Sequence, residues 1–143
     1  MKVISVAKAL IVDDASNILI LYRSKTHPTM AFMPDLPGGI VEPGEDFGHG
    51  LIREIHEEIG LTINLADLTP AYAGAETHTN QNRVRVLYIV RLSEIQPELN
   101  VSWEHDRAEW IPAHQIDKIA KIEAEFIPFY RHALEYIQDN KLL

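Results

Sequence analysis

One segment of the chain, residues 39–61, limits its fold and chemistry more than any other. It reads GIVEPGEDFGHGLIREIHEEIGL, a loop rich in glycine and proline that leads into helix-forming residues. Glu54, Glu57 and Glu58 lie three and four residues apart, so a helix places Glu54 beside both of the others on one face. Clustered carboxylates suit a hard divalent cation. The segment therefore predicts a helix that carries a cation site.

Without a cation this helix is locally unfavourable. Each like-charge pair costs about 0.2–0.5 kcal/mol. Glu57 and Glu58 also precede Gly60, the expected end of the helix, where the helix dipole favours cations. A solvated acidic face is the alternative, but it leaves the flanking loops Leu36–Gly39 and Glu42–Glu45 unexplained. Their glycines and prolines let backbone groups approach a phosphate or a metal closely, so we interpret the whole segment as functional.

The segment resembles the Nudix box, G-x5-E-x7-R-E-U-x-E-E-x-G-U, where U is an aliphatic residue. The chain matches this pattern at every specified position from Gly39 to Leu61. The approach Asp35–Gly39 and the later segment Glu104–Pro112 are similar to those of the bacterial MutT-like subgroup. The resemblance implies the Nudix fold, an α/β (in some schemes α+β) arrangement in which a mixed β-sheet is sandwiched between α-helices.

Length and composition agree with one catalytic domain. The chain has 143 residues, of which 46% are hydrophobic, so we expect a single domain over residues 1–143 with a sizeable core. It has no cysteine, which excludes disulfides and thiolate zinc sites. The sequence has no signal-peptide pattern and no run near the about 20 apolar residues that span a bilayer, so we expect a cytoplasmic protein without membrane contact.

The charge of the chain bears on its partners. The formal net charge of −8 argues against broad binding of nucleic acid or anionic membranes. A small phosphate ligand remains compatible with this charge, because a bound cation reverses the local field.

Hydrophobic periodicity and turn residues predict strands and helices in alternation. The expected strands are Val3–Val12, Ile18–Tyr22, Thr62–Asn64, Tyr72–Ala75, Arg83–Arg91 and Ala108–Ile111, and the expected helices are Asp46–Ile59, Pro112–Lys121 and Ile127–Asn140.

The resemblance also implies metal-binding and catalytic residues. Glu54, Glu57 and Glu58 match the metal-binding glutamates of the family, which bind Mg²⁺, with Mn²⁺ as an alternative. The backbone carbonyl of Gly38 matches a further ligand of MutT-like members. Glu104 matches a glutamate that serves as an extra ligand or as the general base, and a solvent-exposed loop acid is the alternative reading.

Arg53, also in the box, is expected to support the reaction by orienting the carboxylates. We predict that it pairs with Glu45 or Glu54, although an ordinary ion pair on the helix surface fits the sequence equally well.

Five further residues are candidates for contact with substrate. Arg23 ends the second expected strand and could meet a phosphate. Leu36 could line a base pocket, and Gly39 opens the box beside it. Arg83 and Arg85 alternate along one strand, so both face either the cleft or water.

In this family, water attacks a phosphorus of a nucleoside diphosphate linked to a moiety X. The sequence marks of NADH, ADP-ribose and diadenosine polyphosphate hydrolases are not found at their usual places. We therefore favour a MutT-like nucleoside triphosphate pyrophosphohydrolase, with an oxidised purine nucleotide as one candidate substrate. The alternatives are an ADP-ribose or nucleotide-sugar pyrophosphatase, a non-catalytic nucleotide-binding regulator, and an RNA 5′-end pyrophosphohydrolase, which the acidic charge disfavours. The apolar C-terminal helix is compatible with a monomer or a homodimer.

Overall fold

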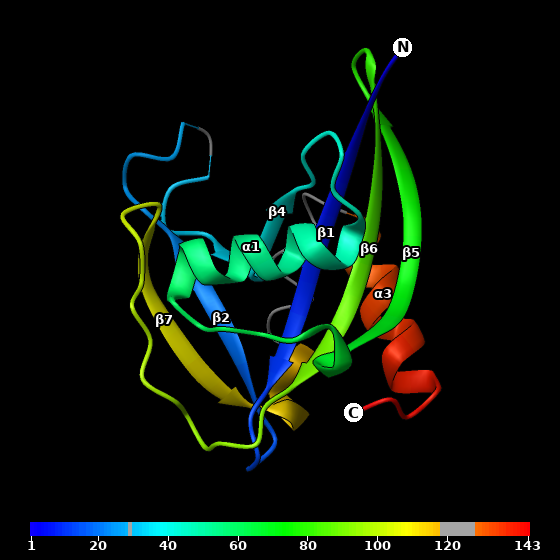
Figure 1. Ribbon diagram of the computed structural model, residues 1–143. Coiled ribbons are helices and arrows are strands. Elements are labelled where there is room, and N and C mark those ends of the chain that lie inside the picture. The colour runs from blue at the N-terminus through cyan, green and yellow to red at the C-terminus, as the bar shows by residue number, and fades with distance from the viewer. Residues whose placement is uncertain (29, 118–127) are drawn as a thin grey trace.

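A seven-stranded sheet forms the centre of the molecule and lies between two helices (Figure 1). The computed structural model describes residues 1–28, 30–117 and 128–143. Five strands follow the order β3-β2-β1-β6-β5, while β4 pairs with β1 and β7 with β2. The strands are β1 (Lys2–Val12), β2 (Asn17–Arg23), β3 (Pro34–Asp35), β4 (Gly38–Ile40), β5 (Leu68–His78), β6 (Gln81–Arg91) and β7 (His105–Pro112). Within the described ranges the helices are α1 (Phe47–Ile59) and α3 (Pro128–Asp139), with two 3₁₀ turns, η1 (Leu65–Asp67) and η2 (Ala113–Gln115).

The sheet splits at one end, and this split makes room for a site. β1 runs parallel to β6 along its whole length. On its other side β1 meets β2 only at Val12 and Ile18, next to the turn that joins the two strands. Farther from that turn, β4 takes the place of β2 and pairs with β1 over Val6–Lys8. The segment between β3 and β4 therefore crosses the opening where β1 and β2 have separated.

Side-chain alternation along the strands produces two cores, one on each face of the sheet. On one face, Ala7, Ala9 and Ile11 of β1 pack with residues of α1. On the other, Leu10 and Val12 pack with residues of α3. The predicted mixed sheet between helices is thus confirmed, and α1 is held firmly against the strands that border the split.

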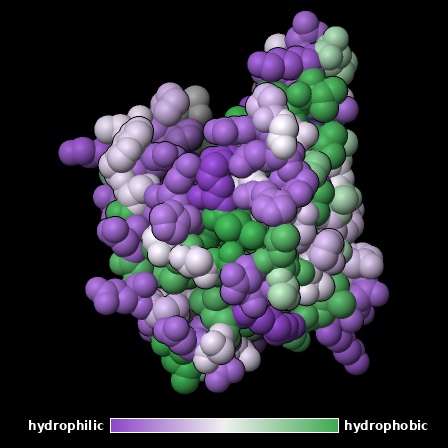
Figure 2. Space-filling model, in the orientation of Figure 1, coloured by the Kyte–Doolittle hydropathy of each residue, from purple (hydrophilic) through white to green (hydrophobic). Residues whose placement is uncertain are grey.

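The box helix begins and ends at residues suited to these places. The Asp46 side chain caps the N-terminus by accepting a hydrogen bond from the backbone N–H of His49 at 2.8 Å. Gly60 ends the helix in the left-handed conformation, with φ of 75°. Figure 2, in the orientation of Figure 1, shows hydrophilic side chains over the upper part of this face and apolar ones near its centre.

Two predicted elements differ from the structure. The expected strand Thr62–Asn64 is wrong, because Ile63 inserts into the core beneath α1 and Asn64 leads directly into η1. In the expected helix Pro112–Lys121, Pro112 ends β7, η2 follows and Ile116 and Asp117 are helical, while residues 118–121 lie outside the described part of the chain. The C-terminal helix is confirmed as α3. Within the described ranges, no helix has the length and apolarity to span a membrane.

Candidate active site

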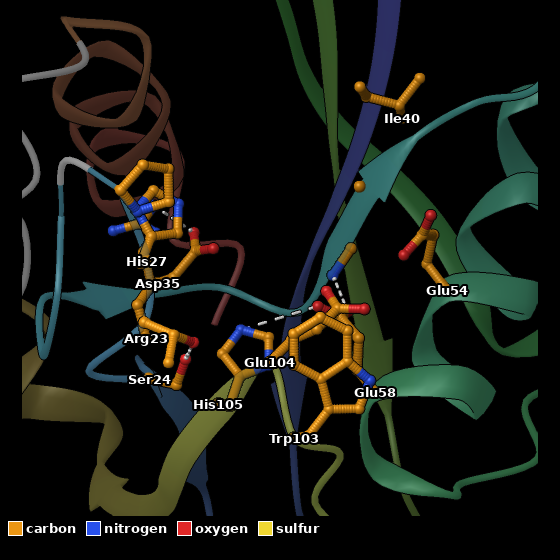
Figure 3. A pocket seen from close by; sticks show the side chains of 14 residues that line it. Arg23, Ser24, His27, Asp35, Ile40, Glu54, Glu58, Trp103, Glu104 and His105 are labelled. Atoms are coloured by element: carbon orange, nitrogen blue, oxygen red, sulfur yellow. Dashed lines mark hydrogen bonds and ion pairs between the residues drawn. The ribbon is translucent and has the colours of Figure 1, made fainter.

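A cavity of about 510 Å³ lies at the split of the sheet (Figure 3). Its walls come from the end of β2 and the loop after it, from β4, from α1 and from the residues around the start of β7. It brings together six residues that the sequence predicted for the site: Arg23, Gly38, Gly39, Glu54, Glu58 and Glu104.

Glu58 is the most deeply placed carboxylate of the cavity, with a relative exposure of 4%. Its Oε1 accepts a hydrogen bond from the backbone N–H of Gly38 at 2.7 Å. Burial raises the pKa of Glu58 to about 8, and burial also raises the pKa of Glu54, one helical turn earlier. Two carboxylates that are poorly solvated beside each other gain most from a bound cation.

Arg53 binds the acidic residues of the box together. Its guanidinium donates to both carboxylate oxygens of Glu45, at 2.8 and 3.0 Å. It also donates to Glu54 and Glu57, each at 3.2 Å, and to the carbonyl of Ile40 at 3.1 Å. The structure therefore contains both predicted partners of Arg53, and this one cation offsets much of the repulsion between the glutamates.

The donor set fits a hard divalent cation. Among the described residues, no three acidic or histidine side chains converge closely enough to hold a metal as they stand. Glu57 turns instead toward Arg53, with 57% of its side chain exposed. The residues that line the cavity nevertheless include Glu54, Glu58 and Gly38, and carboxylate and carbonyl oxygens are the ligand types that Mg²⁺ takes. A Cβ at Gly39 would lie 2.8 Å from the Glu54 carboxylate, so only glycine leaves that carboxylate its place.

Lys8 is a buried part of the site that the sequence analysis did not assign. Its ammonium donates to Asp35 at 3.1 Å and to the carbonyls of Leu36 and Gly38, both at 3.1 Å. Burial alone would lower the pKa of Lys8, but the charge of Asp35 and other neighbours raises it above its ordinary value. Lys8 thus remains charged and fixes the loop between β3 and β4. The sequence signal was a lysine in the middle of a mainly apolar strand.

Residues 102–105 form a further wall of the cavity and are tied to α1. The backbone N–H of Ser102 donates to the carbonyl of Glu58 at 2.8 Å. Ser24 donates to the carbonyl of Glu104 at 3.1 Å. His105 is buried, with Nε2 3.8 Å from Glu58, and burial lowers its pKa. Glu104 lines the cavity and is exposed to solvent.

Three predicted substrate residues lie elsewhere. Leu36 is 3% exposed and belongs to the core on the α3 face. Arg83, Arg85 and Leu87 are two residues apart along β6, so their side chains share one face of the sheet. Leu87 packs into that same core, and the two arginines therefore lie on the face opposite α1. Arg85 is buried and pairs with Glu76 at 2.6 Å. None of the three lines the cavity: Leu36 packs into the core from the connection between β3 and β4, and strand alternation directs Arg83 and Arg85 to the other face.

Comparisons with known proteins agree with the fold. The NUDIX domain model matches residues 2–132. A crystal structure of the MutT protein from Methanosarcina mazei Go1 covers 98% of this chain and 96% of its own, with a TM-score of 0.77 and 26% identity. An Ap4A hydrolase of C. elegans shares the fold, with a TM-score of 0.69 at 22% identity over 95% of this chain and 98% of its own.

A curated relative, the ADP-ribose pyrophosphatase of Methanocaldococcus jannaschii, is 27% identical over 117 residues, which are 82% of this chain and 68% of the relative. The family model spans most of the chain, and the box glutamates Glu54 and Glu58 line the cavity. The chain therefore belongs to the NUDIX family and is a hydrolase of phosphoanhydride bonds.

Proposed function

We propose that the protein hydrolyses nucleoside triphosphates to a nucleoside monophosphate and pyrophosphate in a reaction that depends on Mg²⁺. The observation that carries this proposal is the meeting of Glu54, Glu58 and Glu104 with the glycines of the β4 segment around one cavity. Phosphoryl transfer depends mainly on positioning and on neutralising oxygen charge, and this cavity supplies groups for both.

The residues of the site have two roles, cation binding and proton acceptance. Glu54, Glu57 and Glu58, with the Gly38 carbonyl, would hold the cation. When bound, Mg²⁺ would neutralise phosphate charge and acidify a water molecule. Glu104 accepts a proton from the attacking water. The water oxygen bonds to phosphorus, the bridging P–O bond breaks, and its electron pair leaves with the departing group.

Two residues support this chemistry from fixed positions. Arg53 holds the loop and helix parts of the box in register through its contacts with Glu45 and Ile40. Arg23 lines the cavity and lies 3.3 Å from Asp35, which positions a guanidinium for a substrate phosphate.

ADP-ribose is a second candidate substrate, favoured by the relative from Methanocaldococcus jannaschii. Hydrolysis of its pyrophosphate would give AMP and ribose 5-phosphate by the same attack on phosphorus. The proposed roles of the glutamates are unchanged, because both substrates contain a phosphoanhydride next to a nucleoside.

A substrate panel tests the proposal. Purified protein is incubated with normal and oxidised nucleoside triphosphates, ADP-ribose, nucleotide sugars, dinucleoside polyphosphates and 5′-triphosphorylated RNA, each with Mg²⁺, with Mn²⁺ or with chelator. Products are separated by chromatography. We expect metal-dependent release of pyrophosphate from one group of triphosphates. Release of AMP and ribose 5-phosphate as the dominant reaction would select the second candidate, and tight nucleotide binding without any cleavage would contradict both.

A further inference from the structure

Trp103 is an exposed aromatic residue at the cavity for which the proposed reaction has no use. Nine large hydrophobic side chains of the described residues are exposed, and only Trp103 and Ile40 of these line the cavity. Trp103 has a relative exposure of 81%, the highest of the nine. Figure 3 shows its indole at the edge of the cavity, near Glu104 and His105. An indole left so open makes little contribution to the core.

The backbone that carries Trp103 is nevertheless fixed on both sides. Before it, the N–H of Ser102 donates to the carbonyl of Glu58 at 2.8 Å. After it, the carbonyl of Glu104 accepts from Ser24 at 3.1 Å, and the N–H of His105 donates to the carbonyl of Ser102 at 3.2 Å. The exposed ring is therefore presented from a defined turn that is bonded directly to the catalytic helix. A fixed aromatic surface binds a flat partner at a lower entropic cost than a mobile one.

The surroundings of Trp103 favour a small flat ligand over a protein surface. Its neighbours in the chain, Glu104, Asp106 and Arg107, are exposed charged residues. A docking surface for another protein would need contiguous apolar side chains, and these neighbours interrupt one. In the proposed reaction the carboxylates of the cavity serve the phosphate part of the substrate, which leaves Trp103 for its uncharged part. A nucleobase has two flat faces that stack on an indole.

We propose that Trp103 binds the substrate by stacking on its nucleobase. This inference rests on the proposed action on nucleotides. Stacking on one aromatic face is tolerant of base identity, because every base has a π-face. Trp103 thus gives affinity for nucleosides in general, while discrimination between bases depends on other groups.

The experiment uses two ligands that differ only in the base. AMP and ribose 5-phosphate are titrated, with Mg²⁺ present, into the unchanged protein and into Trp103→Ala, Trp103→Phe and Ile95→Ala. Ile95 is an exposed hydrophobic residue outside the cavity lining, so its variant is the matched control. In a parallel titration, Trp110→Phe leaves Trp103 as the single tryptophan of the chain, and its fluorescence reports the ring directly.

We expect Trp103→Ala to weaken AMP binding by about tenfold or more, whereas ribose 5-phosphate binding is unchanged. Trp103→Phe should recover most of the affinity, and Ile95→Ala should resemble the unchanged protein. AMP should quench the fluorescence of Trp103 in Trp110→Phe, and ribose 5-phosphate should not.

Equal effects of Trp103→Ala on both ligands, or no effect on AMP, would overturn the inference. Its failure is distinguishable from failure of the proposed function. Normal metal-dependent hydrolysis by a protein whose AMP affinity is insensitive to residue 103 removes only the inference. A protein that cleaves no nucleotide but still shows stacking loses only the proposed function.

Discussion

Glu58 illustrates how the fold changes the properties of a single side chain. On an isolated helix it would be an ordinary surface acid, but here it lies under the loop between β3 and β4 and accepts a hydrogen bond from Gly38. Lys8 and His105 face it from β1 and β7, and Glu54 from its own helix. Burial outweighs the charge of Lys8, so the pKa of Glu58 rises to about 8. A cation at this position would displace the proton, which couples metal affinity to pH.

This pKa predicts a pH dependence of stability in the metal-free protein. The folded-state pKa of about 8 exceeds the ordinary value of 4.5, so the folded state holds an extra proton between these values. The free energy of unfolding should therefore fall as pH rises from 4.5 to 8, and Glu58→Gln should remove this part of the slope. Denaturant titrations of both proteins in chelator, across this range, measure the difference. Identical slopes would show that Glu58 is already ionised without metal.

Glu104 is the proposed general base of the reaction. Its replacement by glutamine keeps the size of the side chain but removes the proton acceptor, so kcat should fall by about 10²–10⁴-fold with little change in KM. Steady-state kinetics on the best substrate of the panel measures both constants. Asp106→Asn, an exposed neighbour outside the cavity lining, is the control. If the two variants have the same kcat, Glu104 is a solvated loop acid.

Among single residues, the sequence predicted those whose role depends on spacing within one segment. Glu54, Glu58 and Arg53 are of this kind, because one helix and one loop determine their positions. Lys8 was not assigned, since its importance comes from a contact with Asp35, far away in the chain. Trp103 was not assigned, since its place at the cavity depends on hydrogen bonds that its neighbours Ser102 and Glu104 make with distant segments. The assignment of Arg83 and Arg85 to the substrate site had the same weakness: alternation predicted that they share a face but not which face.

Among the elements, β4 begins at a residue, Gly38, that leaves little room for substitution. Gly38 adopts a φ of 126°, which side chains rarely permit, and a Cβ there would overlap the carbonyl oxygen of Ala7 in β1. Gly44 also has a positive φ, 86°, but its Cβ would enter open space. The pairing of β4 with β1 therefore depends on glycine at position 38 for two reasons, and the turn at Gly44 for only one.

Alanine substitutions at Gly38 and Gly44 separate the cost of a positive φ from the cost of a steric overlap. Gly44→Ala should lower the free energy of unfolding by about 1–2 kcal/mol, the cost of a left-handed residue. Gly38→Ala should cost clearly more, because the overlap with Ala7 must also be relieved by moving β4. Chemical denaturation of both variants measures the costs. Equal costs would mean that β4 shifts without resistance.

Elements with clear local sequence signals were predictable, and a short segment without such signals was not. α1 and α3 have caps or an apolar stripe within the helix itself, and β1 and β6 are long apolar runs. The segment Thr62–Asn64 has strand-forming residues, yet it finds no neighbouring strand and contributes one buried side chain, Ile63. β-propensity without a partner did not produce a strand.

For the whole molecule, function depends on a topology that local patterns do not encode. β1 has β6 on one side and exchanges β2 for β4 on the other, and this exchange opens the cavity. The alternation of strands and helices predicted the class of fold, and the family resemblance implied a mixed sheet between helices, but neither predicted the order of the strands. The net charge of −8 is likewise a property of the whole chain, and it increases the benefit of a bound cation.

Metal binding should stabilise the whole fold, because the carboxylates are arranged as a site only in the folded state. At a Mg²⁺ concentration of about 100 times Kd, the expected gain is about 2.7 kcal/mol. Thermal unfolding with Mg²⁺, compared with NaCl at equal ionic strength, measures this gain. The gain should be much smaller in Glu58→Gln. A gain of the same size with NaCl would instead reflect screening of the net charge.

We propose that the box glutamates hold the cation on which hydrolysis depends. To test this role, turnover is measured against Mg²⁺ concentration for the unchanged protein, for Glu57→Gln and for the control Glu135→Gln on the exposed side of α3. Because Glu57 is largely exposed and pairs only with Arg53 among the described residues, its replacement should alter stability by less than about 0.5 kcal/mol. We predict that Glu57→Gln loses Mg²⁺-dependent turnover while Glu135→Gln keeps it. Full turnover by folded Glu57→Gln at the same Mg²⁺ concentration would contradict the metal site.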